Sequence, residues 1–226
     1  MELSDSKSLA DFFMNGRSAH YSKGEIILVG DNDNLDVHFV SKGFIKVYSI
    51  NDEGDEYTHI IYKTGDIFPL IWALKGLKRH VFYESMDSCV IWKIPKETFT
   101  AHLKANSDNI TYSLLEQLAD QFNIYADRLD NLQYKSAHER VVYRLLFLAG
   151  RFGKKNGKDI IIEAPITHKS IASSINLARE SVSREMELLA GKGLIDNVAG
   201  QIIIREVVGL SKEFSEPVRT DYWGLK

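Results

Sequence analysis

Between residues 111 and 132, apolar or semi-polar residues recur at alternating intervals of four and three. These positions are Thr111, Leu115, Leu118, Phe122, Tyr125, Leu129 and Leu132. A seven-residue period places one narrow stripe along a helix, so this segment predicts a long helix that pairs with a second copy of the chain. A single helix packed on its own domain is the alternative. Polar neighbours such as Glu116, Asp120 and Asn123 favour the paired helix.

The chain before this helix is rich in short segments typical of β-strands. They read EIILVG, HFVSKGFIKVYSI, YTHIIYKTGDIF, HVFYES and CVIWKI, and glycines or Asp/Asn clusters separate them. Strands at this spacing predict an antiparallel β-roll or barrel. The stretch Asn51–Gly54 predicts a hairpin connection within it.

The chain after the long helix predicts further helices with a strand between them. Ser136 stands three residues before Glu139, which is the capping-box pattern at the start of a helix. The apolar side of this helix would consist of Val141, Val142, Leu145, Leu146 and Leu148. A turn and a strand follow in KKNGKDIIIEAPIT, and Thr167 at its end caps a short helix, HKSIASS.

The segment from 167 to 195 predicts two helices joined by a tight turn. Ala172 is small enough to let the second helix approach the first, and Asn176 tolerates the positive φ that the turn needs. The buried side of the second helix would be Val182, Met186 and Leu189. Gly191 and Gly193 then end this helix, and LIDNVAGQIIIRE reads as a two-stranded wing. The pattern is that of a winged helix-turn-helix.

The second helix carries charged and hydroxyl side chains along another edge. At ~100° per residue, four of them fall within an arc of roughly 140°. They are Arg179, Glu180, Ser183 and Arg184. A solvated face with pairs four residues apart is the ordinary explanation for such an edge. The turn asparagine, the apolar underside and the wing favour an edge that reads DNA bases.

Residues 166–195 resemble the recognition module of the cyclic-AMP receptor protein / fumarate-nitrate regulator (CRP/FNR) family. The stretch Ala178–Arg184 matches that family's R-E-x-x-x-R and E-x-x-S-R forms. The resemblance extends over nearly the whole chain and implies an α+β fold. It implies a cupin-like, cyclic-nucleotide-binding-like β-roll over 1–106, a dimerisation helix over 107–135 and a winged helix-turn-helix over 136–226.

The resemblance also implies what the exposed edge would read. Arg179 and Arg184 would donate to guanine or neighbouring bases, and Glu180 would accept from cytosine. With Ser183 beside them, the expected half-site is TGTGA-like or TTGA-like. Phosphate contacts are expected from Thr167, Lys169 and Ser181. The expected partners are double-stranded DNA, a second copy of the chain and RNA polymerase.

The family's cyclic-nucleotide branch carries a phosphate-binding cassette of the form G-x-x-F-G-E-x-x-L, followed by R-S or R-T. This chain has Gly65–Phe68 and then Pro69–Trp72, so the Gly-Glu pair is missing. Arg79-His80 stands where Arg-Ser would be expected. Without the carboxylate and the glycine, cyclic AMP is not the expected effector, although Arg79 could still meet an anion.

Aromatic residues gather in the same part of the chain. They either fill the core of the roll or line a pocket for a small organic effector. The pocket would involve Phe68, Trp72, Arg79 and Phe82. A haem with His80 as an axial ligand is a further alternative. Cys89 lies in an apolar strand and is expected to be a small buried residue rather than a redox sensor.

Composition restricts the remaining possibilities. The 226 residues carry a net charge of −3. Residues 1–137 hold 14 Lys+Arg against 20 Asp+Glu (−6), and residues 138–226 hold 14 against 11 (+3), so the second part is the one suited to phosphate. The single cysteine excludes an internal disulfide framework. Neither a membrane span nor a secretion signal is evident, and the cytoplasm is the expected location.

Two other functions stay open on the sequence alone. One is a cupin-type enzyme with a metal on histidines such as His38, His59 and His80, although no H-x-H pair is present. The other is a ligand-binding regulatory protein whose helical end contacts protein instead of DNA. The sequence favours a regulator without catalytic residues and without a metal site.

Overall fold

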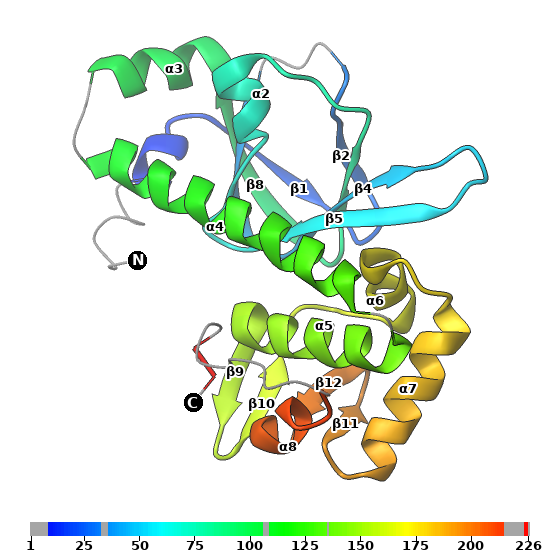
Figure 1. Ribbon diagram of the computed structural model, residues 1–226. Helices are drawn as coiled ribbons and strands as arrows, with labels where there is room; N and C mark the ends of the chain where they lie inside the picture. Colours follow the sequence, from blue (N-terminus) through cyan, green and yellow to red (C-terminus); the bar gives the residue numbers. More distant parts are fainter. Residues whose placement is uncertain (1–8, 33–35, 106–108, 135, 215–223, 226) are drawn as a thin grey trace. The chain divides into compact units, whose positions relative to one another are not determined.

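The chain, described by a computed structural model, divides into two compact units, Met1–Tyr125 and Ala126–Lys226. The division falls within α4 (Asn109–Gln133), which is the long helix expected from the seven-residue period (Figure 1). The structure describes residues 9–32, 36–105, 109–134, 136–214 and 224–225. The expected helix limits, 107 and 135, lie outside these ranges, and so do residues 215–223 of the C-terminal segment.

The first unit contains two four-stranded sheets in which the strand pairs are antiparallel (Figure 1). The first sheet has the strand order β1-β8-β3-β6 and the second has the order β2-β7-β4-β5. The strands are β1 (Arg17–Tyr21), β2 (Ile26–Val29), β3 (Asp36–Lys42), β4 (Ile45–Ile50), β5 (Glu56–Tyr62), β6 (Ile67–Phe68), β7 (Phe82–Ser85) and β8 (Cys89–Pro95). The prediction of an antiparallel β-roll is confirmed.

Two turns show how local sequence sets this topology. Gly43 joins β3 to β4 with a φ of +95°, and an added Cβ would lie 2.6 Å from the Cys89 sulfur, so only glycine fits. Between β4 and β5, the Asn51 side-chain oxygen accepts hydrogen bonds from the backbone N–H groups of Glu53 and Asp55. The predicted hairpin connection at Asn51–Gly54 is therefore confirmed.

The main apolar cluster of the first unit combines the first sheet with the helices around it. Val37 and Phe39 alternate along β3 and so point to the same side. The helices are residues 9–13, α2 (Leu70–Lys75), α3 (Lys96–Ala105) and the first turns of α4. The fully buried members of the cluster include Leu9, Phe13, Ile67, Leu70 and Phe99. Each such side chain contributes about 1.5–3 kcal/mol by leaving water.

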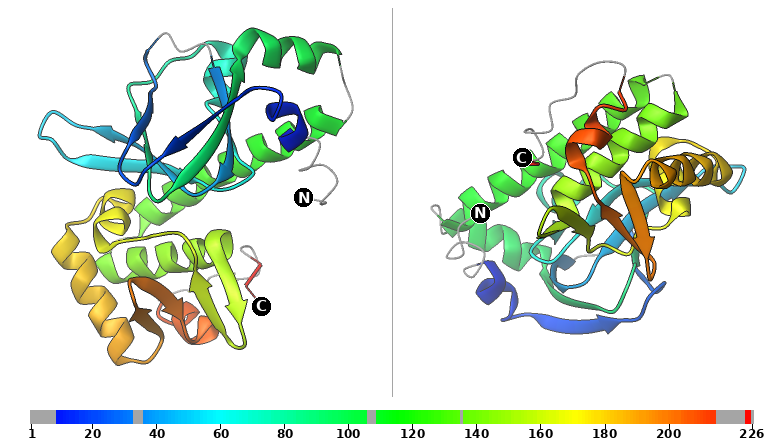
Figure 2. Two further views of the ribbon diagram at one scale, coloured as in Figure 1. Left: turned by 180° about the vertical axis from the view of Figure 1, so that it is seen from behind. Right: turned by 90° about the horizontal axis from the view of Figure 1, so that it is seen from below.

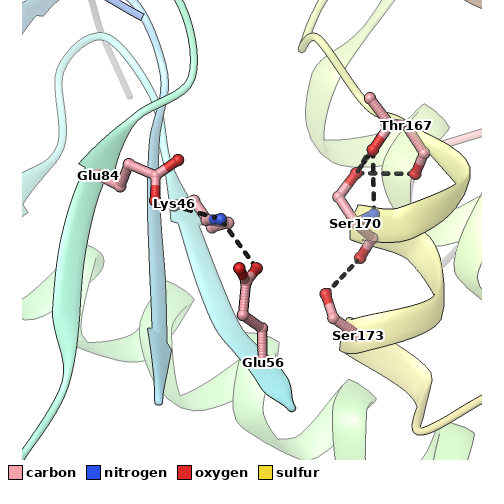
Figure 3. A network of polar contacts seen from close by, with 6 residues as sticks. All are labelled: Lys46, Glu56, Glu84, Thr167, Ser170 and Ser173. Atoms are coloured by element: carbon pink, nitrogen blue, oxygen red, sulfur yellow. Dashed lines mark hydrogen bonds and ion pairs between the residues drawn. The ribbon is translucent and has the colours of Figure 1, made fainter. Parts of the chain in front are cut away.

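A buried cation ties three strands of the second sheet together. The Lys46 ammonium on β4 lies 3.3 Å from the Glu56 carboxylate on β5 and 3.5 Å from the Glu84 carboxylate on β7 (Figure 3). It also lies 4.1 Å from the centre of the Tyr48 ring. Because the Lys46 side chain is only 13% exposed, these partners replace the water it loses.

The second unit consists of helices around one four-stranded sheet of order β11-β12-β10-β9 (Figure 2). Its helices are α5 (Ala137–Phe152), α6 (His168–Ile175), α7 (Arg179–Gly191) and α8 (Val207–Ser211). Its strands are β9 (Gly153–Asn156), β10 (Asp159–Ile162), β11 (Ile195–Val198) and β12 (Gln201–Ile204). The predicted wing is the β11–β12 hairpin, and it also pairs with β10.

Helix α5 forms as its sequence predicts. The Ser136 hydroxyl accepts a hydrogen bond from the backbone N–H of Glu139 and donates one to the Glu139 carboxylate. The buried residues of the helix include all five predicted apolar ones, Val141, Val142, Leu145, Leu146 and Leu148. The smaller helices of the second unit therefore pack against α5.

Candidate DNA-binding helix and effector cavity

Helix α6 begins with a reciprocal cap. The Thr167 hydroxyl accepts from the backbone N–H of Ser170 at 3.1 Å, and the Ser170 hydroxyl accepts from the backbone N–H of Thr167 at 2.7 Å (Figure 3). Thr167 thus caps the helix as predicted, with serine in the place usually taken by Glu or Gln. The cap fixes where α6 starts and leaves Lys169 on its exposed first turn.

The turn between α6 and α7 depends on Asn176. Asn176 adopts φ 54° and ψ 51°, the left-handed conformation that the sequence predicts there. Its backbone N–H and that of Leu177 both donate to the carbonyl oxygen of Ala172. Ala172 is only 4% exposed, as expected for a small residue at a close helix approach. The turn therefore determines the angle at which α7 leaves α6.

Substitutions of Asn176 test this turn. Valine tolerates a positive φ poorly, so Asn176→Val should lower the free energy of unfolding by about 1–2 kcal/mol. Asn176→Gly is the matched control and should change it by only a few tenths, because glycine adopts this conformation without strain. Urea unfolding of both variants measures the difference. Equal loss in the two variants would show that the asparagine side chain matters more than the backbone conformation.

Helix α7 presents two different sides. Val182, Met186 and Leu189 are at most 4% exposed and pack it onto the unit, which confirms the predicted buried side. Arg179, Glu180 and Arg184 are exposed. The guanidinium group of Arg184 makes a long hydrogen bond of 3.5 Å to the Ser181 hydroxyl. The exposed edge thus carries two cations and one carboxylate.

Ser183 differs from the other members of this edge. It is half-buried, and its hydroxyl lies 2.9 Å from Nδ1 of His168 on α6. No local sequence pattern indicates this contact, because the two residues belong to different helices. A base contact by Ser183 would share or exchange that hydrogen bond. Ser181 is likewise half-buried, whereas Thr167 and Lys169 are exposed at the start of α6.

A polar cluster that was not predicted from the sequence connects α7 to α5. His138 on α5 lies 2.8 Å from Glu185 through Nδ1 and 2.9 Å from Glu213 through Nε2. Lys192 also hydrogen-bonds Glu213, and the bonds from Lys192 and His138 lower the pKa of Glu213. The partners are 47 and 75 residues from His138 in sequence, so no local pattern indicates the cluster.

The wing is a short hairpin closed by Ala199 and Gly200. Both have positive φ, 52° and 82°, which a two-residue hairpin turn of type I′ requires. Arg205 then binds Asp159 on β10 and Asp196 on β11, at 3.0 Å for the latter. These bonds hold the wing to the sheet beside α7.

Helix α4 exposes only part of the predicted seam. Leu115, Phe122 and Leu129 are 58%, 73% and 66% exposed. Leu118, Tyr125 and Leu132 are half-buried, and Leu118 packs against the apolar cluster of the first unit. Tyr112, which the seven-residue pattern did not include, is 59% exposed. The exposed stripe, defined as Tyr112, Leu115, Phe122 and Leu129, is therefore narrower than predicted and shifted around the helix.

A cavity of about 490 Å³ lies in the first unit and is called the effector cavity below. Trp72 and Arg79 line it, as predicted. The other lining residues are Gly30, Val47, His59, Ile60, Tyr62, Pro69, Leu70, Ile71, Leu77, Lys78, Val81, Tyr83, Gln121 and Tyr125. The lining is largely apolar and aromatic, with a few polar groups, which is typical of a site for a small organic ligand.

Two residues predicted for this pocket lie elsewhere, and the expectation for them is corrected. Phe82 precedes Tyr83 on β7, and neighbouring residues of a strand point to opposite sides, so Phe82 packs against Tyr48 instead. Phe68 is fully buried and stacks on Tyr62 and Tyr83, with ring centres 5.4 and 5.1 Å away. Phe68 therefore packs against Tyr62 and Tyr83, two of the residues that line the cavity.

Helix α4 is fastened directly to the loop that borders the cavity. The Gln117 side chain accepts from the backbone N–H of Ile67 at 2.9 Å and donates to the carbonyl of Gly65 at 3.0 Å. Gln121 and Tyr125, further along α4, line the cavity itself. A change in the shape of the cavity would therefore be transmitted to α4 through Gln117, Gln121 and Tyr125.

The loop itself differs from a cyclic-nucleotide cassette. Pro69 and Leu70 occupy the positions of the family's Gly-Glu pair, and the Leu70 side chain is 1% exposed within the apolar cluster. No carboxylate thus faces a ribose from this position. His59 does line the cavity, with its Nε2 held 2.9 Å from the Ser49 hydroxyl.

Two residues considered as haem or redox groups have other surroundings. His80 is exposed, and its Nδ1 lies 2.6 Å from Asp31. Cys89 is fully buried, and burial raises the pKa of its thiol to about 11, so it is not a ready thiolate. Among the residues that the structure describes, no three His, Cys, Asp or Glu side chains form a group that could hold a metal ion.

An antiparallel roll, a long helix and a winged helix with an exposed cationic edge together define the class of DNA-binding regulators. Comparisons agree with this class. A family model described as a cyclic nucleotide-binding domain matches residues 18–106, and one described as a Crp-like helix-turn-helix domain matches residues 139–213. The chain belongs to the CRP/FNR family of DNA-binding transcription regulators and is not an enzyme.

Relatives and solved structures cover most of the chain. The global nitrogen regulator of Nostoc sp. is 25% identical over 181 residues, covering 79% of this chain and 81% of that protein. The fumarate and nitrate reduction regulatory protein of Vibrio cholerae is 22% identical over 203 residues, covering 87% and 80%. A CooA mutant from Carboxydothermus hydrogenoformans has a TM-score of 0.74 at 22% identity, covering 91% and 90%. These comparisons confirm the α+β fold class.

None of the helices in the described ranges has both the length and the apolar character needed to cross a membrane.

Proposed function

We propose that the chain acts as a homodimer that places α7 of each copy in successive major grooves of a DNA palindrome. The observation that carries this proposal is the exposure of Arg179, Glu180 and Arg184 on a helix whose opposite side is buried. Two such helices, related by a two-fold axis, would lie about 34 Å apart on the duplex. The proposed half-sites are TGTGA-like or TTGA-like.

Each side chain of the exposed edge has a role in this proposal. The guanidinium groups of Arg179 and Arg184 donate to guanine O6 and N7 or to neighbouring bases, and the Glu180 carboxylate accepts from cytosine N4. Ser183 joins them only if it shares its bond to His168. Thr167, Lys169 and Ser181 contact phosphates, which sets position but carries no sequence information.

Dimerisation would use the exposed stripe of α4. Tyr112, Leu115, Phe122 and Leu129 recur at intervals of three and seven and lie on one side of the helix. Large apolar side chains that are more than half exposed favour burial against a second copy. The proposed dimer helix spans 107–135, between a roll at 1–106 and a winged helix at 136–226.

The effector cavity would hold a small organic ligand other than cyclic AMP. Its aromatic walls suit an apolar ligand body, and Arg79 and Lys78 suit an anionic group on it. A haem is less well supported, because His80 does not line the cavity and His59 is hydrogen-bonded to Ser49. The ligand would shift α4 through Gln117, Gln121 and Tyr125 and so alter the spacing of the recognition helices.

The cavity proposal predicts the outcome of a direct binding test. Calorimetric titration of the intact protein with cyclic AMP should show no saturable binding at millimolar concentrations, since Leu70 offers no acceptor for a ribose hydroxyl. Mass analysis of the protein as purified should detect an organic ligand, without the visible absorption of haem. Micromolar binding of cyclic AMP would contradict this prediction.

The intact protein tests the DNA-binding proposal. Selection from a pool of random duplexes should yield palindromes whose half-sites lie one helical turn apart. Selection of unrelated sequences, or none, would instead favour a regulatory protein that contacts other proteins. The proposed place of action is the cytoplasm, on promoters where RNA polymerase is the further partner.

A further inference from the structure

A hydrogen bond between the two helices of the DNA-binding motif involves Ser183, the half-buried member of the exposed edge. The Ser183 hydroxyl on α7 lies 2.9 Å from Nδ1 of His168, the first residue of α6. His168 is also half-buried, and it stands between Thr167 and Lys169, two exposed residues for which phosphate contacts are proposed. This histidine therefore joins the turn proposed to contact phosphates to the edge proposed to read bases.

The direction of the Ser183 hydroxyl differs from that of other helical serines in this chain. A serine within a helix commonly donates back to a carbonyl of the preceding turn. Ser173 does so at 3.2 Å (Figure 3), and Ser174 and Ser211 do so at 2.7 and 2.8 Å. In the described part of the chain, the Ser183 hydroxyl makes no such bond, and its hydrogen-bond partner is His168. His168 therefore keeps this hydroxyl turned away from the carbonyls of α7.

The position of the proton on the His168 ring decides what Ser183 can offer to a base. A neutral imidazole has one donor nitrogen and one acceptor nitrogen. Among the described residues, Nε2 of His168 has no hydrogen-bond partner. Phosphate oxygens only accept, so beside a DNA backbone the proton is assigned to Nε2, and Nδ1 is then the acceptor. The Ser183 hydroxyl thus donates to His168 and keeps its lone pairs for a base.

We propose that His168 is a positioning residue for base reading, which orients the Ser183 hydroxyl so that Ser183 accepts from an amino group of a base. This inference rests on the proposed DNA binding by α7 and deepens it. The amino groups in the major groove are cytosine N4 and adenine N6, whereas guanine O6 and thymine O4 are acceptors and give such an oxygen no donor. Since Glu180 lies one turn before Ser183, the edge offers two acceptors beside its guanidinium donors.

The base preferences of the intact protein on a selected operator test the proposal. Each base pair of one half-site is replaced in turn, and fluorescence anisotropy measures the affinity of every variant. Ser183→Ala identifies the base pair that Ser183 reads, because the preference there should fall by about three- to tenfold. His168→Phe, which keeps a ring without nitrogens, should lower the preference at the same base pair by a similar factor. The double variant should lose no more, since the two residues act as a unit.

Two further variants separate positioning from a structural role. His168→Asn keeps an acceptor near the place of Nδ1 and should retain the preference. His20→Phe makes the same change as His168→Phe at an exposed position of β1 and should alter no preference. The proposal is overturned if Ser183→Ala changes no preference, or if His168→Phe weakens binding equally at every base pair. The second result would mean that His168 supports the fold or contacts phosphate only.

Base analogues test which kind of group Ser183 reads. Purine in place of adenine, or 2-pyrimidinone in place of cytosine, removes the amino group at the identified base pair. This removal should weaken binding by the wild-type protein about three- to tenfold and should not weaken binding by Ser183→Ala further. A loss that instead follows removal of a carbonyl oxygen there would contradict the proposal. If the wild-type protein had no base preference, the proposed function itself would fail, whereas a preference that persists in His168→Phe refutes only the role of His168.

Discussion

Replacing Phe122 with arginine should separate the proposed dimer and lower affinity for a palindromic operator by about 10²–10⁴-fold. Phe122 is 73% exposed on the stripe of α4, where two copies would bury it. A charge placed in that contact loses its water without gaining a partner. Once the copies separate, the second half-site is no longer bound within one complex, and the gain from two linked contacts disappears. Light scattering and DNA titration of the same samples measure both effects.

Asp120→Arg provides the matched control for this experiment. Asp120 is also exposed on α4, but it lies about 160° around the helix from Phe122. The same residue introduced there should leave the protein dimeric and its operator affinity within about threefold of wild type, since surface changes away from contacts have small effects. If Phe122→Arg remained a dimer with full affinity, α4 would not be the dimer contact.

Replacing Arg179 or Arg184 with alanine should weaken operator binding by about 1–3 kcal/mol, or roughly 5- to 150-fold. Both guanidinium groups are exposed on α7, and each would lose a pair of bonds to a base edge. Binding to random DNA should change much less, because the base contacts do not contribute there. Glu180→Ala should relax the preference at the cytosine it faces.

The control for these substitutions removes a positive charge elsewhere in the same unit. Lys155→Ala changes an exposed residue of β9 and should weaken specific and random DNA equally or not at all. Fluorescence anisotropy with an operator and a scrambled duplex separates the loss of specific binding from the loss of binding to random DNA. Equal losses on both duplexes for the arginine variants would mean that Arg179 and Arg184 contact phosphates rather than bases.

The features that sequence predicted are those set by neighbouring residues. Capping at Ser136 and Thr167, the positive φ at Asn176 and the buried side of α7 each depend on a few adjacent positions. Helical periodicity and cap chemistry act over one or two turns, so they can be predicted from the sequence. The order of roll, long helix and winged helix followed from these local signals.

The features that sequence missed depend on strand register and distant contacts. Phe82 and Tyr83 are adjacent aromatic residues, and only the register of β7 decides which of them lines the effector cavity. The bond between Ser183 and His168, and the cluster around His138, join separate elements. The seam on α4 was also misjudged at Leu118, because the roll covers part of the helix that the seven-residue period marks as free.

Methylation interference on the selected operator tests the reading of DNA bases most directly. Methylation of guanine N7 blocks the atom to which an arginine fork would donate. The predicted result is that methylated guanines in both half-sites, about 34 Å apart, prevent binding by the intact protein. In the variants Arg179→Ala and Arg184→Ala, methylation of at least one of these guanines in each half-site should no longer affect binding. Binding that is insensitive to guanine methylation, or sensitive in a single half-site only, would contradict a dimer that reads base edges with α7.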